Sequence, residues 1–224
     1  MIPAVDAYLF DIDGTLLNSA PDICGAVQQV LSATSERPSL SHEFLKGYIG
    51  RHLIELFGDI FPHYSSEQVD RMIQDYRAIY VARGHTQTAI YPGVMEALAA
   101  LPGRKATATT KGTPTTRAVL QQFGLIQYFD HVQGTDGIPC KPAPDVLLAA
   151  LNGLSAQPAD CLMVGDSAAD MEAGRRAGVK ICAVSYGYGQ PNDLARWKPD
   201  YWVSDLRELL PTGSPVNIAL NSHL

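Results

Sequence analysis

Asp11-Ile12-Asp13-Gly14-Thr15 directly follows an apolar run, Val5 to Phe10, near the start of this 224-residue chain. Such a short apolar run is typical of a buried strand. Residues i and i+2 of an extended segment point to the same side, so Asp11 and Asp13 are expected to face one site. Two neighbouring anions are unfavourable unless a cation or a proton separates them. Gly14 lets the chain turn sharply and brings backbone N–H groups close to a ligand.

This pentapeptide has two other interpretations. A solvated turn at the end of a strand is the simplest alternative if the motif is considered alone. A calcium-binding EF-hand loop fits poorly, because its glycine belongs at the sixth position and here glycine is at the fourth. The preceding segment is also an apolar strand rather than a helix.

Strand and helix patterns alternate after Tyr91, which predicts an α/β fold with a parallel sheet covered on both faces. Besides the first strand, the predicted strands are residues 105–110, 131–133, 161–164, 180–184 and 201–203. The predicted helices of this part are residues 94–101, 113–123, 143–151 and 168–177.

The segment from Ser19 to Gly84 has a different pattern, with apolar residues at helical spacing and no convincing strand. Pro21 suits a first helical turn, and Gly84 suits the end of a helix. Further helices are predicted at residues 41–48, 52–57 and 66–83. We therefore expect a Rossmann-like core of residues 1–17 and 90–224, an all-helical insert of residues 18–89, and a loosely held tail from about residue 212.

A second acidic motif, Gly165-Asp166-Ser167-Ala168-Ala169-Asp170, follows another apolar strand. Asp170 falls in the first turn of the next helix, where a negative charge is favourable even without a direct role. The carboxyl ends of parallel strands form the ligand crevice of such sheets. Asp11, Asp13 and Asp166 are therefore expected to converge as hard oxygen ligands that suit Mg²⁺.

Thr109 and Lys141 are two further candidates. Thr109 ends a predicted strand before a helix, so its hydroxyl and the nearby N–H groups are suited to holding phosphate oxygens. Lys141 precedes another predicted helix. Considered singly, these residues are an ordinary strand threonine and an ordinary solvated lysine, and only the nearby acids make them candidates.

The composition limits the class of partner and the compartment. The net charge of -6 argues against a general nucleic-acid surface, although a phosphorylated small molecule needs only a few local positive groups. The cysteines form no C-x-x-C pair, which favours free thiols in a reducing compartment. No signal-peptide pattern and no membrane-spanning stretch is present, so a cytoplasmic protein without a membrane partner is expected. The cysteines are Cys24, Cys140, Cys161 and Cys182.

In this order, the motifs resemble those of the haloacid dehalogenase superfamily of phosphatases, over nearly the whole chain to about Leu210. The four family motifs are matched by residues 11–15, Thr109, Lys141 and residues 165–170, and the helical insert matches a cap domain. Residues 16–23 and 186–189 resemble more particularly the phosphoglycolate phosphatase subgroup. Asn18 and Thr110 depart from that subgroup, which usually has Asp and Asn at these positions.

The resemblance implies a mechanism. Asp11 attacks the phosphorus, while Asp13 protonates the leaving alkoxide and then activates water. Mg²⁺ is held by the Asp11 carboxylate, the Asp13 backbone carbonyl and Asp166, with Asp170 farther from the ion. Thr109 and Lys141 bind the oxygens of the phosphoryl group in flight.

The resemblance also implies a small phosphorylated metabolite as substrate, with 2-phosphoglycolate as the best candidate, and a monomer or homodimer. Gly14, Thr15, Thr110 and Lys111 are the expected contacts on the core, and Gly50 and Arg51 those on the cap. Arg51 is expected to bind the distal anion of the substrate, and a solvated charge at a helix end is the alternative.

Three other functions use similar residues. A phosphosugar mutase of the beta-phosphoglucomutase type shares the core but returns the phosphate to a bound sugar. A dehalogenase needs no Mg²⁺, and the second acid, Asp13, is typical of the phosphatase branch. A receiver-like signalling domain also carries a phosphoaspartate, but it is about half as long and lacks a large helical insert.

Overall fold

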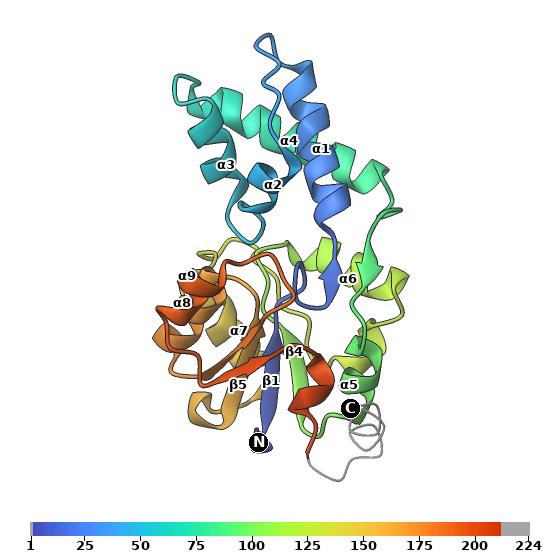
Figure 1. The fold of residues 1–224 in the computed structure, drawn as a ribbon, viewed down its shortest axis with the longest axis vertical. Coiled ribbons are helices and arrows are strands. Elements are labelled where there is room, and N and C mark those ends of the chain that lie inside the picture. The colour runs from blue at the N-terminus through green and yellow to red at the C-terminus, as the bar shows by residue number, and fades with distance from the viewer. Residues whose placement is uncertain (1, 212–224) are drawn as a thin grey trace.

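The computed structural model describes residues 2–211, and it confirms the predicted α/β class (Figure 1). Five parallel strands form one sheet in the order β4-β1-β5-β6-β7. The strands are β1 (Ala7–Phe10), β4 (Arg104–Thr107), β5 (Cys161–Gly165), β6 (Lys180–Val184) and β7 (Tyr201–Val203). The predicted tail from residue 212 lies outside the described residues.

The central strands β1 and β5 are buried along their whole length, which explains why both are apolar throughout. Tyr8 and Phe10 of β1 pack on one side with α5 (Val94–Ala100) and α6 (Thr113–Gln122). Ala7 and Leu9 pack on the other side with α7 (Asp145–Leu154) and α8 (Ala168–Ala177). The alternation of side chains along β1 thus fills two separate cores.

The strand order positions the first acidic motif. The chain runs from β1 to β4 on one side of it, and returns to β5 on the other side. In an open parallel sheet, ligands bind beyond the carboxyl ends of the strands where the order reverses in this way. The carboxyl end of β1, which Asp11 directly follows, is therefore the expected ligand-binding point.

A helical block stands above this edge of the sheet (Figure 1) and has an apolar core of its own. Its helices are α1 (Ala20–Ala33), α2 (His42–Lys46), α3 (Leu53–Ile60) and α4 (Ser66–Ala82). Two short strands that the sequence did not indicate, β2 (Leu17–Asn18) and β3 (Ala89–Ile90), pair antiparallel where the chain enters and leaves the block. The two crossings therefore lie side by side.

The predicted strand at residues 131–133 is a single bridge between Ala106 and His131. The hydroxyl of Thr107 accepts from the Gln133 N–H and donates to its carbonyl oxygen, both at 2.8 Å. Backbone bonds join His131 to Lys105 and Thr107, and beyond them the Thr107 side chain takes the place of further ladder bonds. Because β4 ends at Thr107, Thr109 and Thr110 lie in the loop that follows it, not in the strand.

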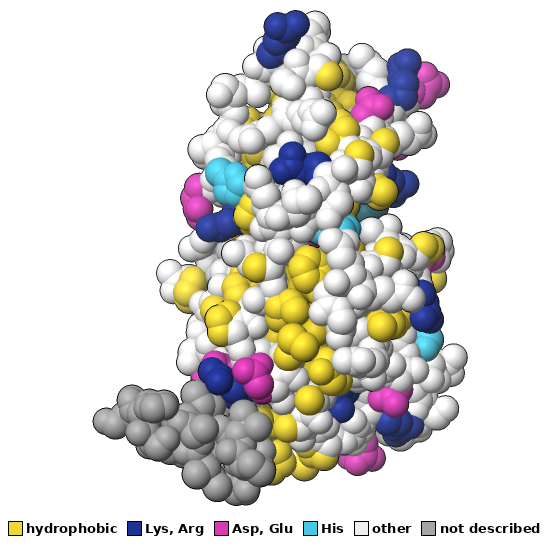
Figure 2. All heavy atoms as spheres, turned by 90° about the vertical axis from the view of Figure 1, so that its right-hand side faces the viewer, with side chains coloured by type: hydrophobic (Ala, Val, Ile, Leu, Met, Phe, Trp, Pro, Cys, Tyr) yellow, Lys and Arg dark blue, Asp and Glu magenta, His cyan; other side chains and the backbone are white. Residues whose placement is uncertain are grey.

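The remaining elements are the short helix α9 (Pro191–Ala195) and 3-10 turns at residues 126–128, 158–160 and 206–209. No helix within residues 2–211 is both long and apolar enough to cross a membrane. On the face drawn in Figure 2, Lys and Arg side chains are scattered rather than gathered into a stripe. This distribution agrees with the weak case for a nucleic-acid surface.

Candidate active site

The ends of two paired strands bring the first acids together. Asp11 follows β1, and its N–H donates to the Val164 carbonyl of β5 at 3.0 Å. Asp166 directly follows β5. Gly14 turns between them with φ 89°, and any side chain there would collide with the Asp166 carboxylate. Glycine at position 14 is therefore required by close approach as well as by conformation.

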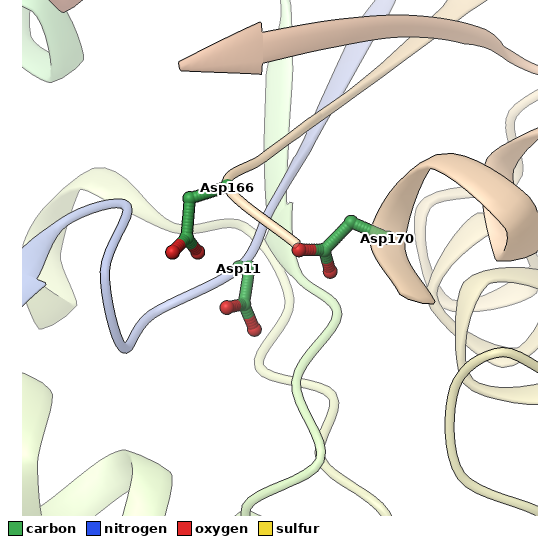
Figure 3. A group of neighbouring side chains, drawn as sticks. All are labelled: Asp11, Asp166 and Asp170. Carbon is green, nitrogen blue, oxygen red and sulfur yellow. The ribbon is translucent and has the colours of Figure 1, made fainter. Parts of the chain in front are cut away.

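Asp11, Asp166 and Asp170 form a buried cluster in which one oxygen atom of each lies within 4.8 Å of the others (Figure 3). Burial, partly offset by the charge of Lys141, raises the pKa of Asp11 to about 7, and the charges of Asp170 and Asp13 contribute. Burial and the neighbouring Asp170 and Asp11 charges also raise the pKa of Asp166. The three carboxylates thus need more positive charge beside them to be stable in their ionised form.

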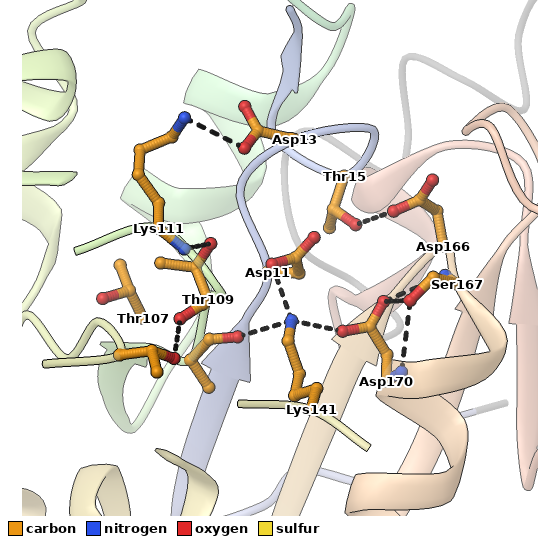
Figure 4. A network of polar contacts seen from close by, with 12 residues as sticks. Asp11, Asp13, Thr15, Thr107, Thr109, Lys111, Lys141, Asp166, Ser167 and Asp170 are labelled. Carbon is orange, nitrogen blue, oxygen red and sulfur yellow. Dashed lines mark hydrogen bonds and ion pairs between the residues drawn. The ribbon is translucent and has the colours of Figure 1, made fainter. Parts of the chain in front are cut away.

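Lys141 supplies part of that charge (Figure 4). Its Nζ donates to Asp11 Oδ1 at 2.7 Å, to Asp170 Oδ1 at 2.5 Å and to the Ala108 carbonyl at 2.8 Å. The residue is only 2% exposed. Burial alone would lower the pKa of Lys141, but the charges of Asp11 and Asp170 outweigh it and raise the pKa. All three donors of the ammonium are used, so its position is fixed.

The donor set fits a divalent cation. One ammonium offsets only part of the charge of three buried carboxylates, and their oxygens are the ligands that Mg²⁺ prefers. Asp170 is the most occupied of the three, because its Oδ2 also accepts from the N–H and hydroxyl of Ser167 at 2.9 and 2.6 Å. This reciprocal cap at the start of α8 fixes the Asp170 carboxylate.

The carboxylate of Asp13 lies apart from this cluster. Its Oδ1 accepts from the Ser19 hydroxyl at 2.6 Å, and its Oδ2 lies 3.2 Å from Lys111 Nζ. The predicted metal set was Asp11, Asp13 and Asp166, whereas the carboxylates brought together are those of Asp11, Asp166 and Asp170. The contribution predicted for Asp13, through its backbone carbonyl, stays a prediction.

Of the predicted phosphate contacts Thr15, Thr109 and Lys111, Thr15 touches the cluster directly. The hydroxyl of Thr15 donates to Asp166 Oδ1 at 3.2 Å. Thr109 is buried, and its hydroxyl accepts the Lys111 N–H at 3.4 Å, which shapes the loop after β4. Burial alone would lower the pKa of Lys111, but the charges of Asp13 and Tyr80 outweigh it and raise the pKa.

A cavity of about 620 Å³ opens between the helical block and the core. Asp13, Thr110 and Lys111 line it from the core, and Gly50 and Arg51 line it from the loop between α2 and α3. This loop reaches the core: a Cβ on Gly50 would lie 3.4 Å from that of Ser167. The Arg51 guanidinium lies 5.2 Å from the centre of the Tyr48 ring. Substrate contact by Gly50 and Arg51 stays a prediction.

Two tyrosines that the sequence did not single out as site residues lie beside the cluster, and one of them, Tyr188, joins it to the helical block. The Tyr188 N–H donates to Asp166 Oδ2 at 2.7 Å, and its phenol oxygen accepts from the N–H groups of Ser19 and Ala20 at 2.8 and 3.0 Å. The Tyr186 hydroxyl donates to the Thr15 carbonyl at 2.8 Å. The Tyr-Gly-Tyr-Gly repeat was a signal for them, but their partners, far away in the sequence, were not.

Tyr188→Phe is expected to lower the melting temperature. Ser19 is the N-cap of α1, yet its hydroxyl is given to Asp13, so the Tyr188 oxygen takes the capping role. Losing a cap costs about 1 kcal/mol. Thermal denaturation measures this loss, with Tyr201→Phe on β7 as the control that removes a phenol oxygen elsewhere. Equal melting temperatures for the two variants would contradict the capping role.

Comparison with known proteins agrees with this geometry. A profile of haloacid dehalogenase-like hydrolases matches residues 8–184. The phosphoglycolate phosphatase of Nitrosospira multiformis is 35% identical over 91% of this chain and 93% of its own length. Phosphoglycolate phosphatase 1 of Pseudomonas aeruginosa is 34% identical over 91% of this chain and 78% of its own.

Solved structures agree as well. The crystal structure of a predicted phosphatase from Clostridium acetobutylicum superimposes with a TM-score of 0.84 at 27% identity, covering 92% of this chain and 97% of its own. Because the matching family and these relatives are hydrolases and phosphatases, the protein is an enzyme of the phosphatase type. The chain belongs to the haloacid dehalogenase-like hydrolase family.

Proposed function

We propose that the protein is a Mg²⁺-dependent phosphomonoester hydrolase that forms an aspartyl-phosphate on Asp11, with 2-phosphoglycolate as the first candidate substrate. The observation that carries the proposal is the buried contact of Lys141 with both Asp11 and Asp170, beside Asp166, at the carboxyl end of β1. The relatives named phosphoglycolate phosphatase support the choice of substrate.

Asp11 is the nucleophile in this proposal. Lys141 holds its Oδ1, so the carboxylate has a fixed orientation from which the second oxygen can attack phosphorus. The P–O bond to the leaving group breaks as the bond to Asp11 forms. Thr109 and the loop after β4 would bind the other phosphoryl oxygens, and the positive charge of Lys141 beside them would stabilise those oxygens.

Asp13 is the acid and base in this proposal. It lines the cavity, where a leaving group has room, and it is separate from the Asp11 cluster. It gives a proton to the departing alkoxide and then takes one from the water that hydrolyses the aspartyl-phosphate. The Ser19 hydroxyl and Lys111 orient its two oxygens in the free protein.

Asp11, Asp166 and the Asp13 backbone carbonyl would hold Mg²⁺, with Asp170 positioning Lys141 beside them. The ion supplies positive charge that offsets the repulsion between the Asp11 carboxylate and an anionic phosphate.

We also propose that residues 18–89 act as a cap domain hinged at the β2–β3 pair. Two short antiparallel segments side by side permit a rigid rocking motion of the block over the sheet edge. Closure would exclude water from the cluster while the phosphoryl group is transferred. Gly50 and Arg51, on the loop that already reaches Ser167, are the proposed cap contacts with substrate.

Phosphate release from a panel of small phosphomonoesters tests the function. The panel contains 2-phosphoglycolate, hexose phosphates, a nucleotide and pyrophosphate, each with Mg²⁺ and with a chelator as the blank. We expect Mg²⁺-dependent release, highest for 2-phosphoglycolate. Failure to hydrolyse any phosphomonoester would overturn the proposed function, and preference for another ester would replace only the substrate.

Mg²⁺ is expected to raise the melting temperature more at about pH 8 than at about pH 5. Burial and nearby acids hold the pKa of Asp11 at about 7, above the value of about 4 in an unfolded chain. The metal-free fold therefore loses stability as pH rises between these values, and at the lower pH a proton competes with the cation.

Thermal denaturation with and without Mg²⁺ at the two pH values measures this difference. In Asp166→Asn, which removes a charged ligand without changing shape, the Mg²⁺ effect should largely disappear. An equal shift at both pH values, or an undiminished shift in the variant, would contradict binding at this cluster.

A further inference from the structure

Lys111 lines the cavity and contacts Asp13, the proposed acid and base. Of the aspartates Asp11, Asp13, Asp166 and Asp170, it is Asp13 that lines the cavity, and Lys111 Nζ lies 3.2 Å from Asp13 Oδ2. If Asp13 protonates the leaving group, the departing oxygen lies next to Asp13. Atoms one or two bonds beyond that oxygen then lie within reach of the Lys111 ammonium.

The helical block contributes a mainly apolar wall to the cavity. Its side chains there include Ile23, Val27, Leu45, Leu56 and Tyr76. A leaving group rich in hydroxyls, such as a sugar, would leave polar groups unpaired against this wall, which costs free energy. A short leaving group that carries one charge near the ester oxygen avoids this cost, provided that a cation lies at the inner end of the cavity.

Within residues 2–211, the Lys and Arg side chains that line this cavity are Arg51, Arg77 and Lys111. Of these three, only Lys111 contacts Asp13. Arg51 and Arg77 are exposed, and the Arg51 guanidinium lies over the Tyr48 ring. The Lys111 side chain is 10% exposed. A short substrate therefore meets Lys111 before either arginine.

Tyr80 of α4 holds Lys111 in this place. The ammonium donates to the Tyr80 hydroxyl at 3.1 Å and lies 4.5 Å from the centre of its ring. An ammonium has three N–H donors, and within residues 2–211 its bonding partners are the Asp13 carboxylate and the Tyr80 hydroxyl. One donor can thus serve a further anion, and the low exposure strengthens such a contact.

We infer that Lys111 is the specificity residue that binds a carboxylate on the leaving group, so that the protein selects phosphate esters of short hydroxy acids over esters of neutral alcohols and sugars. The inference rests on the proposed function. It places recognition of the leaving-group charge on the core, at Lys111, instead of at Arg51 of the cap, where the sequence alone suggested it.

The test compares two substrates with the same two-carbon leaving group. 2-Phosphoglycolate carries the carboxylate, and ethyl phosphate lacks it. The wild type should prefer 2-phosphoglycolate in kcat/KM. Lys111→Met keeps the aliphatic stem and removes the charge, so it should lose about ten- to a hundredfold on 2-phosphoglycolate, the range for a charged hydrogen bond, and much less on ethyl phosphate.

Lys111→Arg keeps a cation and should retain part of the preference. Arg117→Met, on the exposed side of α6, is the charge-matched control and should leave kcat/KM unchanged for both substrates. Arg51→Met tests the competing position: if it, and not Lys111→Met, removes the preference for 2-phosphoglycolate, the inference is wrong.

Equal losses on both esters would mean that Lys111 acts through Asp13 or the fold, which also overturns the inference. If Lys111→Met fails to fold, Arg51→Met decides between the two positions: an unchanged preference for 2-phosphoglycolate supports the inference, and loss of that preference overturns it. Hydrolysis of neither ester by the wild type, by contrast, is a failure of the proposed function itself.

Discussion

Asp11→Asn is expected to lower kcat by roughly 10⁴-fold or more, on the scale of removing the nucleophile of another hydrolase. An amide oxygen is a poor nucleophile and cannot form the aspartyl-phosphate. The later step, in which Asp13 activates water to hydrolyse that intermediate, then has no substrate. The amide keeps the shape of the carboxylate and can still accept from Lys141 at the position of Oδ1. The fold should therefore stay intact.

Steady-state kinetics on the best substrate of the panel measure this loss, and circular dichroism checks the fold. Asp70→Asn, on the exposed side of α4, is the control that removes the same charge from a residue outside the cavity lining. An Asp11→Asn protein with more than a few per cent of wild-type turnover would show that Asp11 does not form the covalent bond.

Lys141→Met has the second-largest expected effect, a loss of about 10²- to 10³-fold in kcat/KM, which is typical of removing one preorganised charge stabiliser. Methionine retains most of the buried stem but leaves Asp11 and Asp170 without their shared partner. Breaking a buried ion pair costs about 3–5 kcal/mol, so the metal-free variant should also melt at a lower temperature. Added Mg²⁺ should recover part of this stability.

Lys141→Arg should restore activity only in part, because a planar guanidinium does not fit a site where one nitrogen serves Asp11, Asp170 and the Ala108 carbonyl. Lys46→Met is the control, since Lys46 forms a surface ion pair with Glu43 and such pairs contribute little. Wild-type kinetics for Lys141→Met would return this lysine to a purely structural role.

The sequence predicted those parts of the fold that follow from local rules. The apolar strand before Asp11, the second apolar strand before Asp166 and the helical periodicity from Ser19 to Gly84 each depend on neighbouring residues. From them, the parallel sheet and its acidic edge follow, and the structure confirms this fold class. The site roles derived from the resemblance still await the experiments above.

Contacts between distant residues were beyond the same rules. Tyr188 caps a helix about 170 positions earlier in the chain, and Lys111 pairs with Tyr80 of the helical block. The use of the Ser19 hydroxyl by Asp13 could not be foreseen either, because a serine at this position normally caps its own helix. Each partner was visible in the sequence, but the three-dimensional arrangement decides the pairing.

Trapping the covalent intermediate tests the central claim most directly. The enzyme is mixed with Mg²⁺ and 2-phosphoglycolate, or the best ester of the panel, quenched during turnover and reduced with borohydride, which converts an aspartyl-phosphate to homoserine. Peptide mass spectrometry then locates the reduced residue. Homoserine is expected at position 11, dependent on substrate and Mg²⁺ and absent from Asp11→Asn. Reduction at another residue, or no reduced residue at any quench time in an enzyme that is turning over, would contradict that claim.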